Sequence, residues 1–170
     1  MANHGVIRTD RMYGTDVAAN LVSVKYMGTG ATATAIDNGN VVKLDGLMAG
    51  EREVYKGVTP AASDALDNIA IIATPEVLYD EHKKGLEEFE NEAGRICRAY
   101  IPHTHDIFSV TADALDIASG ATVAVGWVAE LKAGTKLTLK ASATSGSTQV
   151  GKIIAIETVG RYTYYVIQVV

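Results

Sequence analysis

The fold class is indicated by the stretch Asp37-Asn38-Gly39-Asn40-Val41-Val42-Lys43-Leu44-Asp45-Gly46. Asn38-Gly39 supplies the positive φ angles that a tight hairpin turn needs, and runs rich in Thr and Val flank it. Residues 31–36 before the turn alternate Ala with Thr or Ile, as a strand does. The stretch therefore predicts a β-hairpin. Residues 51–60 alternate polar and apolar side chains and end at a proline, which predicts a half-buried antiparallel strand.

Further short β patterns follow along the chain, without amphipathic helices between them. Residues 69–74 are a short apolar run before Pro75, typical of a core strand that is buried on both faces. Residues 150–157 and 162–169 predict a closing hairpin. The other expected strands are residues 21–26, 107–111, 121–125 and 136–140. Seven or more strands at short spacing predict a single, mainly β domain, either barrel-like or a sandwich.

Composition limits the class of protein. The chain has 170 residues, enough for one well-filled core, and a net charge of −5, which argues against a groove for nucleic acid. Its single cysteine, Cys97, cannot form an internal disulfide. The first residues lack a signal-peptide pattern, and no apolar run approaches the length of a membrane span. We expect a soluble protein that is made in the cytoplasm and contacts neither a membrane nor nucleic acid directly.

The first 19 residues differ from the rest because they show neither strand nor helix periodicity. Such a mixed segment either remains in solvent or packs against something else. We expect residues 1–19 to be an extended N-terminal arm and residues 20–170 to be a β-rich body. Arg8 and Arg11 are candidates for pairing with carboxylates of a partner, and Met12 and Tyr13 are candidates for apolar anchors.

Residues 80–92 are the most acidic part of the chain, and their glycines weaken a helix. We expect a solvated, charged loop with at most a short helix, and an acidic functional patch is the alternative.

Sequence motifs for catalysis, metal binding or nucleotide binding are weak. His103 and His105 lie two residues apart, so on a strand both imidazoles would share one face, but two ligands do not complete a zinc site and their segment has the character of a turn. Cys97 is expected to be a buried apolar residue rather than a nucleophile. Residues 28–33 fit the loose G-x-G-x-x-A pattern, but β-prone residues follow where a nucleotide site needs a helix. We therefore expect no cofactor, no resident metal and no enzymatic activity.

Five stretches spread along the chain are considered together, namely residues 7–11, 38–44, 89–95, 106–111 and 164–169. On these stretches the chain resembles the small head proteins of tailed bacteriophages, in particular the decoration or cement proteins of the capsid. It contains no catalytic motif. The chain is longer than the smallest decoration proteins, and the acidic loop has no counterpart role in that family.

The resemblance implies a structural virion protein on the capsid exterior. Such a protein binds the outer surface of the phage major capsid shell, acts as a homo-oligomer, with a trimer as one form, and stabilises the expanded head. It implies that an N-terminal arm clamps neighbouring subunits, a role carried here only onto residues 1–19. Two other classes stay open. A tail-associated or receptor-binding β module would bind glycans through the Tyr162/Tyr164 face, and a small hydrolase would need a pocket with convergent polar groups.

Overall fold

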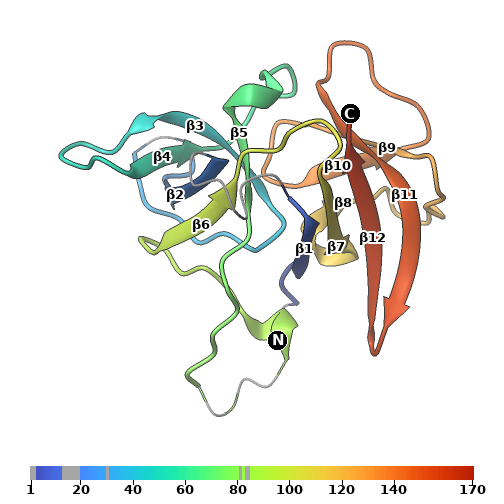
Figure 1. Ribbon diagram of the computed structural model, residues 1–170, viewed down its shortest axis with the longest axis horizontal. Helices are drawn as coiled ribbons and strands as arrows, with labels where there is room; N and C mark the ends of the chain where they lie inside the picture. Colours follow the sequence, from blue (N-terminus) through green and yellow to red (C-terminus); the bar gives the residue numbers. More distant parts are fainter. Residues whose placement is uncertain (1–2, 13–19, 30, 81, 83–84) are drawn as a thin grey trace.

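The computed structural model describes residues 3–12, 20–29, 31–80, 82 and 85–170, and it has two β units side by side (Figure 1). One is a closed five-stranded barrel and the other is a seven-stranded sheet. Strands make up 43% of the structure, and the only helical elements in the described ranges are short 3-10 turns. The predicted mainly β class is confirmed.

The barrel closes in the order β2-β4-β3-β5-β6. Its strands are β2 (Leu21–Tyr26), β3 (Val41–Leu47), β4 (Val54–Val58), β5 (Ile69–Ile72) and β6 (Ile96–Tyr100). Strand β4 is antiparallel to β3, as predicted, and parallel to β2 on its other side.

The sheet has the order β1-β7-β12-β11-β9-β10-β8. Its strands are β1 (Ile7–Arg11), β7 (Ile107–Thr111), β8 (Leu115–Asp116), β9 (Val128–Glu130), β10 (Leu137–Lys140), β11 (Gln149–Val159) and β12 (Tyr162–Val169). The 3-10 turns of the chain lie between strands and are η2 (Leu66–Asn68), η3 (Leu86–Glu88) and η4 (Ala112–Ala114). The closing hairpin is confirmed, because β11 and β12 pair antiparallel around the turn at Gly160.

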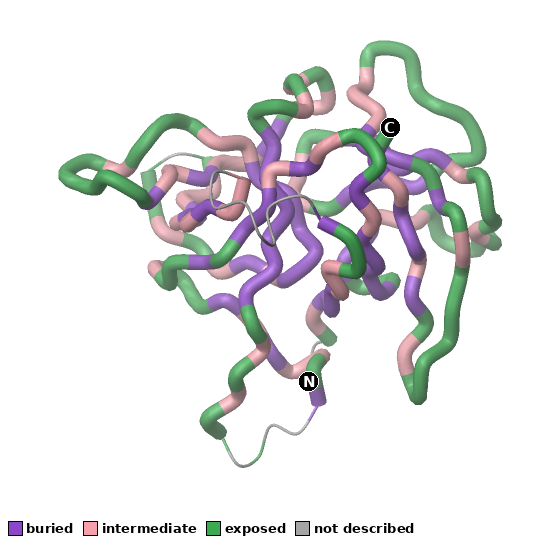
Figure 2. Tube along the Cα trace, viewed as in Figure 1, coloured by how far each residue is buried: buried purple, intermediate pink, exposed green. Residues whose placement is uncertain are grey.

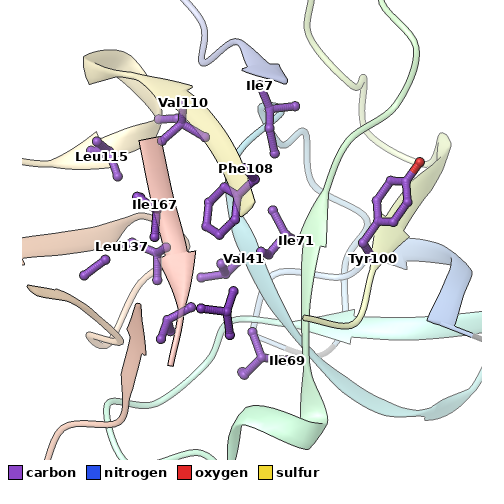
Figure 3. Close-up of a cluster of buried hydrophobic side chains, with 14 of the residues drawn as sticks. Ile7, Val41, Ile69, Ile71, Tyr100, Phe108, Val110, Leu115, Leu137 and Ile167 are labelled. Carbon is purple, nitrogen blue, oxygen red and sulfur yellow. The ribbon is translucent and has the colours of Figure 1, made fainter. Parts of the chain in front are cut away.

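The apolar run of β5 joins the two units. Ile69 and Ile71 point into a cluster that also contains Phe108 and Ile167 of the sheet (Figure 3), whereas Ala70 and Ile72 belong to the barrel interior. All four β5 residues have no exposed surface. Because alternate side chains of a strand point to opposite faces, one short run serves both cores. The predicted strand buried on both faces is confirmed, and buried residues concentrate between the two units (Figure 2).

Two predicted strands are wrong. Residues 31–36 form no strand apart from an isolated bridge between Ile36 and Asn91, and residues 121–125 are irregular. Half of residues 31–36 and four of residues 121–125 are exposed, because runs of Ala, Thr and Val this short give neither face enough apolar area to bury. The predicted hairpin at residues 31–46 is therefore absent: its second half is β3, which pairs with β4 and β5 instead.

The Asn38-Gly39 turn has another role. The buried side-chain amide of Asn38 bonds both backbone groups of Thr74: Asn38 Nδ2 donates to Thr74 O at 2.7 Å, and Thr74 N donates to Asn38 Oδ1 at 3.0 Å. Asn38 Oδ1 also accepts a hydrogen bond from Asn91 Nδ2 at 3.1 Å. Gly39 has φ +80°, and a Cβ there would lie 2.7 Å from Ala114 Cβ of η4. The turn is thus a buried polar junction between barrel, sheet and the 85–92 loop.

The expected extended arm is wrong for residues 3–12. Ile7–Arg11 form β1, which pairs antiparallel with β7, and Ile7 and Met12 are buried in the core between the two units. The register of β1 shifts between Arg8 and Arg11, so the segment lacks a regular alternation that would have marked it as a strand. Tyr13 and the rest of 13–19 lie outside the described residues.

The acidic loop agrees in part with its prediction. It contains one short 3-10 turn, η3, but Phe89 and Asn91 are buried, so its second half belongs to the core rather than to solvent.

Candidate functional site

The candidate binding surface is the outer edge of β1, which is the terminal strand of the seven-stranded sheet. We call Arg8, Asp10 and Arg11 the β1 edge. Exposure rises along the strand, from buried Ile7 to exposed Asp10 and Arg11. A terminal strand presents backbone groups that no strand of its own sheet satisfies, and charged side chains on it discourage indiscriminate pairing. The edge therefore combines hydrogen-bonding capacity with charge.

Arg8 is held by contacts within the chain. Its guanidinium lies 3.0 Å from Asp10 Oδ1 and 3.9 Å from Glu157 Oε2, and it stacks over the Tyr164 ring at 5.1 Å. Asp10 also accepts a hydrogen bond from the Ser109 hydroxyl. Burial raises the pKa of the Tyr164 phenol. Because the Arg8 side chain is 41% exposed, these ion pairs add little stability but fix the direction of the side chain.

The other two described residues of the predicted arm, Arg11 and Met12, lie in different environments. Arg11 pairs in register with Ile107 and has an exposed side chain. Met12 is 6% exposed and packs in the core, so it is not available as an anchor while β1 is in place. The structure thus leaves Arg11 exposed on the terminal strand, directs the Arg8 side chain across the sheet toward Tyr164 and Glu157 of β12 and β11, and buries Met12.

The predicted chemical candidates occupy structural positions. His103 and His105 lie in the turn between β6 and β7, where His103 Nδ1 is 3.1 Å from Ile101 O and His105 has φ 75°. Neither belongs to a group of three metal-ligating side chains in the part of the chain that is described. Cys97 lines the barrel interior, and burial raises its pKa to about 11, so its thiol is not activated.

The Tyr162/Tyr164 face is occupied by the chain itself. Tyr164 is buried beneath Arg8, and the Tyr162 hydroxyl donates to the Glu87 carboxylate. That hydrogen bond, with help from Arg161, lowers the pKa of Glu87. The Tyr164 ring is therefore covered, the Tyr162 ring is half-buried, and Glu87 attaches the acidic loop to the β11–β12 hairpin.

One group of side chains was not predicted from the sequence. His4, Asp37 and Glu90 each offer one ligand atom, and these atoms lie within 4.8 Å of one another. His4 Nδ1 is 2.7 Å from Asp37 Oδ1. The three residues are far apart in the chain and no spacing pattern connects them, so no local signal could have identified the group.

Comparisons with known proteins add no relative: no protein-family model, curated protein or solved structure matches this chain. Within the described ranges, no helix has the length and apolar character that crossing a membrane requires.

Proposed function

We propose that this protein is a non-enzymatic structural virion protein that binds the outer surface of a phage major capsid shell and stabilises the expanded head. The resemblance of residues 7–11, 38–44, 89–95, 106–111 and 164–169 to capsid decoration proteins supports the family. The observation that carries the proposal is the β1 edge, because the N-terminal segment expected to contact the shell ends its sheet with two arginines that are not buried.

Attachment takes a different form from a free arm. The apolar residues Ile7 and Met12 are committed to the core, so the contact with the shell is made by the outer edge of β1 and by Arg11. A strand edge binds an extended segment of a partner by adding it to the sheet, and an exposed guanidinium pairs with a carboxylate beside it. Each contact is modest, but a shell presents the same site many times, so avidity makes occupancy stable for an oligomer.

Homo-oligomer formation is part of the same proposal. Strand β11 leaves Ile154, Ile156 and Val159 between 39% and 51% exposed in the single chain. Ile156 and Val159 lie three positions apart and so point to opposite faces of the strand, and we propose that the face carrying Ile156 contacts another copy. Light scattering of the purified protein measures this directly, and Ile156→Lys should shift the oligomer toward monomer, whereas a wild-type protein that is already monomeric at high concentration would contradict it.

The test of the proposed function is a charge reversal at the β1 edge. Arg11→Glu should leave the melting temperature within about 2 °C of wild type, because exposed substitutions change stability by about 0.5 kcal/mol or less. It should weaken binding to expanded capsids by about tenfold or more, which corresponds to ~1.4 kcal/mol. The matched control is Arg52→Glu, an exposed arginine in the β3–β4 loop, far from β1 (Figure 1).

Co-sedimentation with purified expanded capsids gives the affinities. Equal loss of binding for Arg11→Glu and Arg52→Glu would show that only net charge matters and would reject the β1 edge. Absence of wild-type binding would reject the function itself. Deletion of the whole N-terminal segment is a poorer test, since it removes a strand of the sheet and uncovers the core.

A further inference from the structure

The cluster of His4, Asp37 and Glu90 brings donors for a metal ion together from three separate segments. His4 and Asp37 side chains are 21% and 18% exposed, so the cluster is largely shielded but reachable. Ligands of one Zn²⁺ ion at about 2.0–2.2 Å from the metal are ~3–4 Å apart. The cluster therefore needs only small adjustments: His4 Nδ1 and Asp37 Oδ1, now 2.7 Å apart, separate slightly, and the other ligand atoms, within 4.8 Å, come closer.

The backbone holds the two carboxylates in place. Ile36 and Asn91 form an isolated β-bridge, in which Ile36 N donates to Asn91 O at 2.9 Å and Asn91 N donates to Ile36 O at 3.1 Å. Asp37 directly follows one partner of this bridge and Glu90 directly precedes the other. Ligands carried by a fixed backbone lose little entropy when a metal binds.

The imidazole is held by a third set of contacts. The His4 backbone N–H donates to Glu87 O at 2.9 Å, which fixes the N-terminal segment beside η3 (Figure 1). The next residue, Gly5, packs so closely that an added Cβ would lie 2.4 Å from Asn38 O. The N-terminal segment is therefore clamped on both sides of the histidine.

A separate observation is that the same junction contains two buried hydrogen-bond acceptors without a donor among the described residues. The side-chain oxygens of Asn40 and Asn91 are buried and accept no hydrogen bond from any described residue. They belong to the same turn and the same loop that carry Asp37 and Glu90. Buried acceptors without a donor are rare in native proteins, and a bound water molecule or ion is a usual reason for one.

We propose that His4, Asp37 and Glu90 bind one divalent transition-metal ion, with Zn²⁺ as the best match. One imidazole nitrogen and two carboxylate oxygens suit Zn²⁺ and leave a position for water. The ion takes the place of the hydrogen bond between His4 and Asp37, and the imidazole keeps its proton on the ring nitrogen that does not bind the ion. The ion cancels the repulsion between the two carboxylates. Because the ion ties the segment before β1 to two fixed loops, it stabilises the pairing of β1 with β7.

The experiment uses the untagged 170-residue chain, freed of metal by dialysis against a chelator. Isothermal titration with ZnCl₂ should show one saturable site per chain, and a Zn²⁺ concentration of about 100 times the Kd should raise the melting temperature by about 5–10 °C. MnCl₂ and CaCl₂ serve as comparison ions. Glu90→Gln should weaken Zn²⁺ binding by at least about tenfold, and His4→Ala should abolish the melting shift.

Two matched variants separate this site from other surface ligands. Glu92→Gln changes an exposed carboxylate two residues from Glu90, and His82→Ala removes an exposed imidazole outside the cluster; both should bind Zn²⁺ as wild type does. Unchanged binding in Glu90→Gln and His4→Ala, or no saturable site in wild type, would overturn the proposal. Glu90→Gln keeps the size of the side chain, so it reports on the ligand even if His4→Ala folds poorly. None of these measurements involves a capsid.

Discussion

Replacing Asn38 with alanine tests the buried junction on which the fold depends. The Asn38 side chain makes four hydrogen bonds: with Thr74 N and O, with Asn91 Nδ2, and with Glu76 Oε1 at 3.0 Å. Asn38→Ala leaves three buried groups without partners, namely the N–H and C=O of Thr74 and the Asn91 amide. Each costs ~1–3 kcal/mol, and water entering the vacated space satisfies some of them.

We therefore expect Asn38→Ala to lower the free energy of unfolding by about 3–5 kcal/mol, a large share of the ~5–15 kcal/mol typical of a folded domain. The melting temperature should fall by about 6–20 °C, since ~1 kcal/mol corresponds to about 2–4 °C at this chain length. The assay is urea unfolding followed by circular dichroism. The matched control is Asn68→Ala, an exposed amide in η2 that should change stability by about 0.5 kcal/mol or less.

A loss below about 1 kcal/mol in Asn38→Ala, or an equal loss in both variants, would refute this reasoning. It would mean that water replaces the amide without cost and that the junction between barrel, sheet and loop is not specified by Asn38.

Three further predictions concern stability and reactivity. Gly39→Ala should lower the free energy of unfolding in urea by about 2–4 kcal/mol, because Gly39 has a left-handed backbone and an added Cβ would collide with Ala114 of η4. Gly46 has a similar φ but open space around it, so Gly46→Ala should lower the free energy of unfolding by only ~1–2 kcal/mol. Equal losses in the two variants would contradict the close packing at Gly39. The hydrogen bond from Lys43 lowers the pKa of Asp64. The pair therefore stabilises the fold at pH values above the ordinary pKa of 3.8, and this contribution is lost as the pH falls through the lowered pKa. Asp64→Asn should flatten the acid side of the plot of melting temperature against pH, and an unchanged plot would argue against the pair. The thiol of Cys97, with a pKa of about 11, should resist an aromatic disulfide reagent at pH 8 in the native protein and react once urea unfolds it; fast native reaction would show that the barrel opens.

Local patterns predicted the strands whose side chains alternate between a core and solvent or between two cores. Strands β5, β11 and β12 were identified in this way, since their burial follows their own sequence. Patterns failed where pairing depends on distant partners. The alternating residues 31–36 have too little apolar area to form a strand, and β1 is hidden by its register shift. The parallel pairing of β2 with β4 has no local signal.

The candidate sites show the same division. Exposed Arg11 and buried Cys97 were anticipated from residue type and surroundings. The burial of Met12 was not, because an apolar side chain in a polar segment fits both an anchor for a partner and a place in its own core. The His4, Asp37 and Glu90 cluster arises only when the Asn38 junction folds three segments together, so tertiary structure alone reveals it.

The most direct test of the proposed function is the copy number of the protein on purified expanded capsids at saturation, with the thermal stability of those capsids measured before and after binding. We expect saturation at a fixed ratio to the major capsid protein, set by the shell lattice, together with a rise in the capsid melting temperature. A handful of copies per particle, or full occupancy without any gain in capsid stability, would contradict a role in stabilising the head.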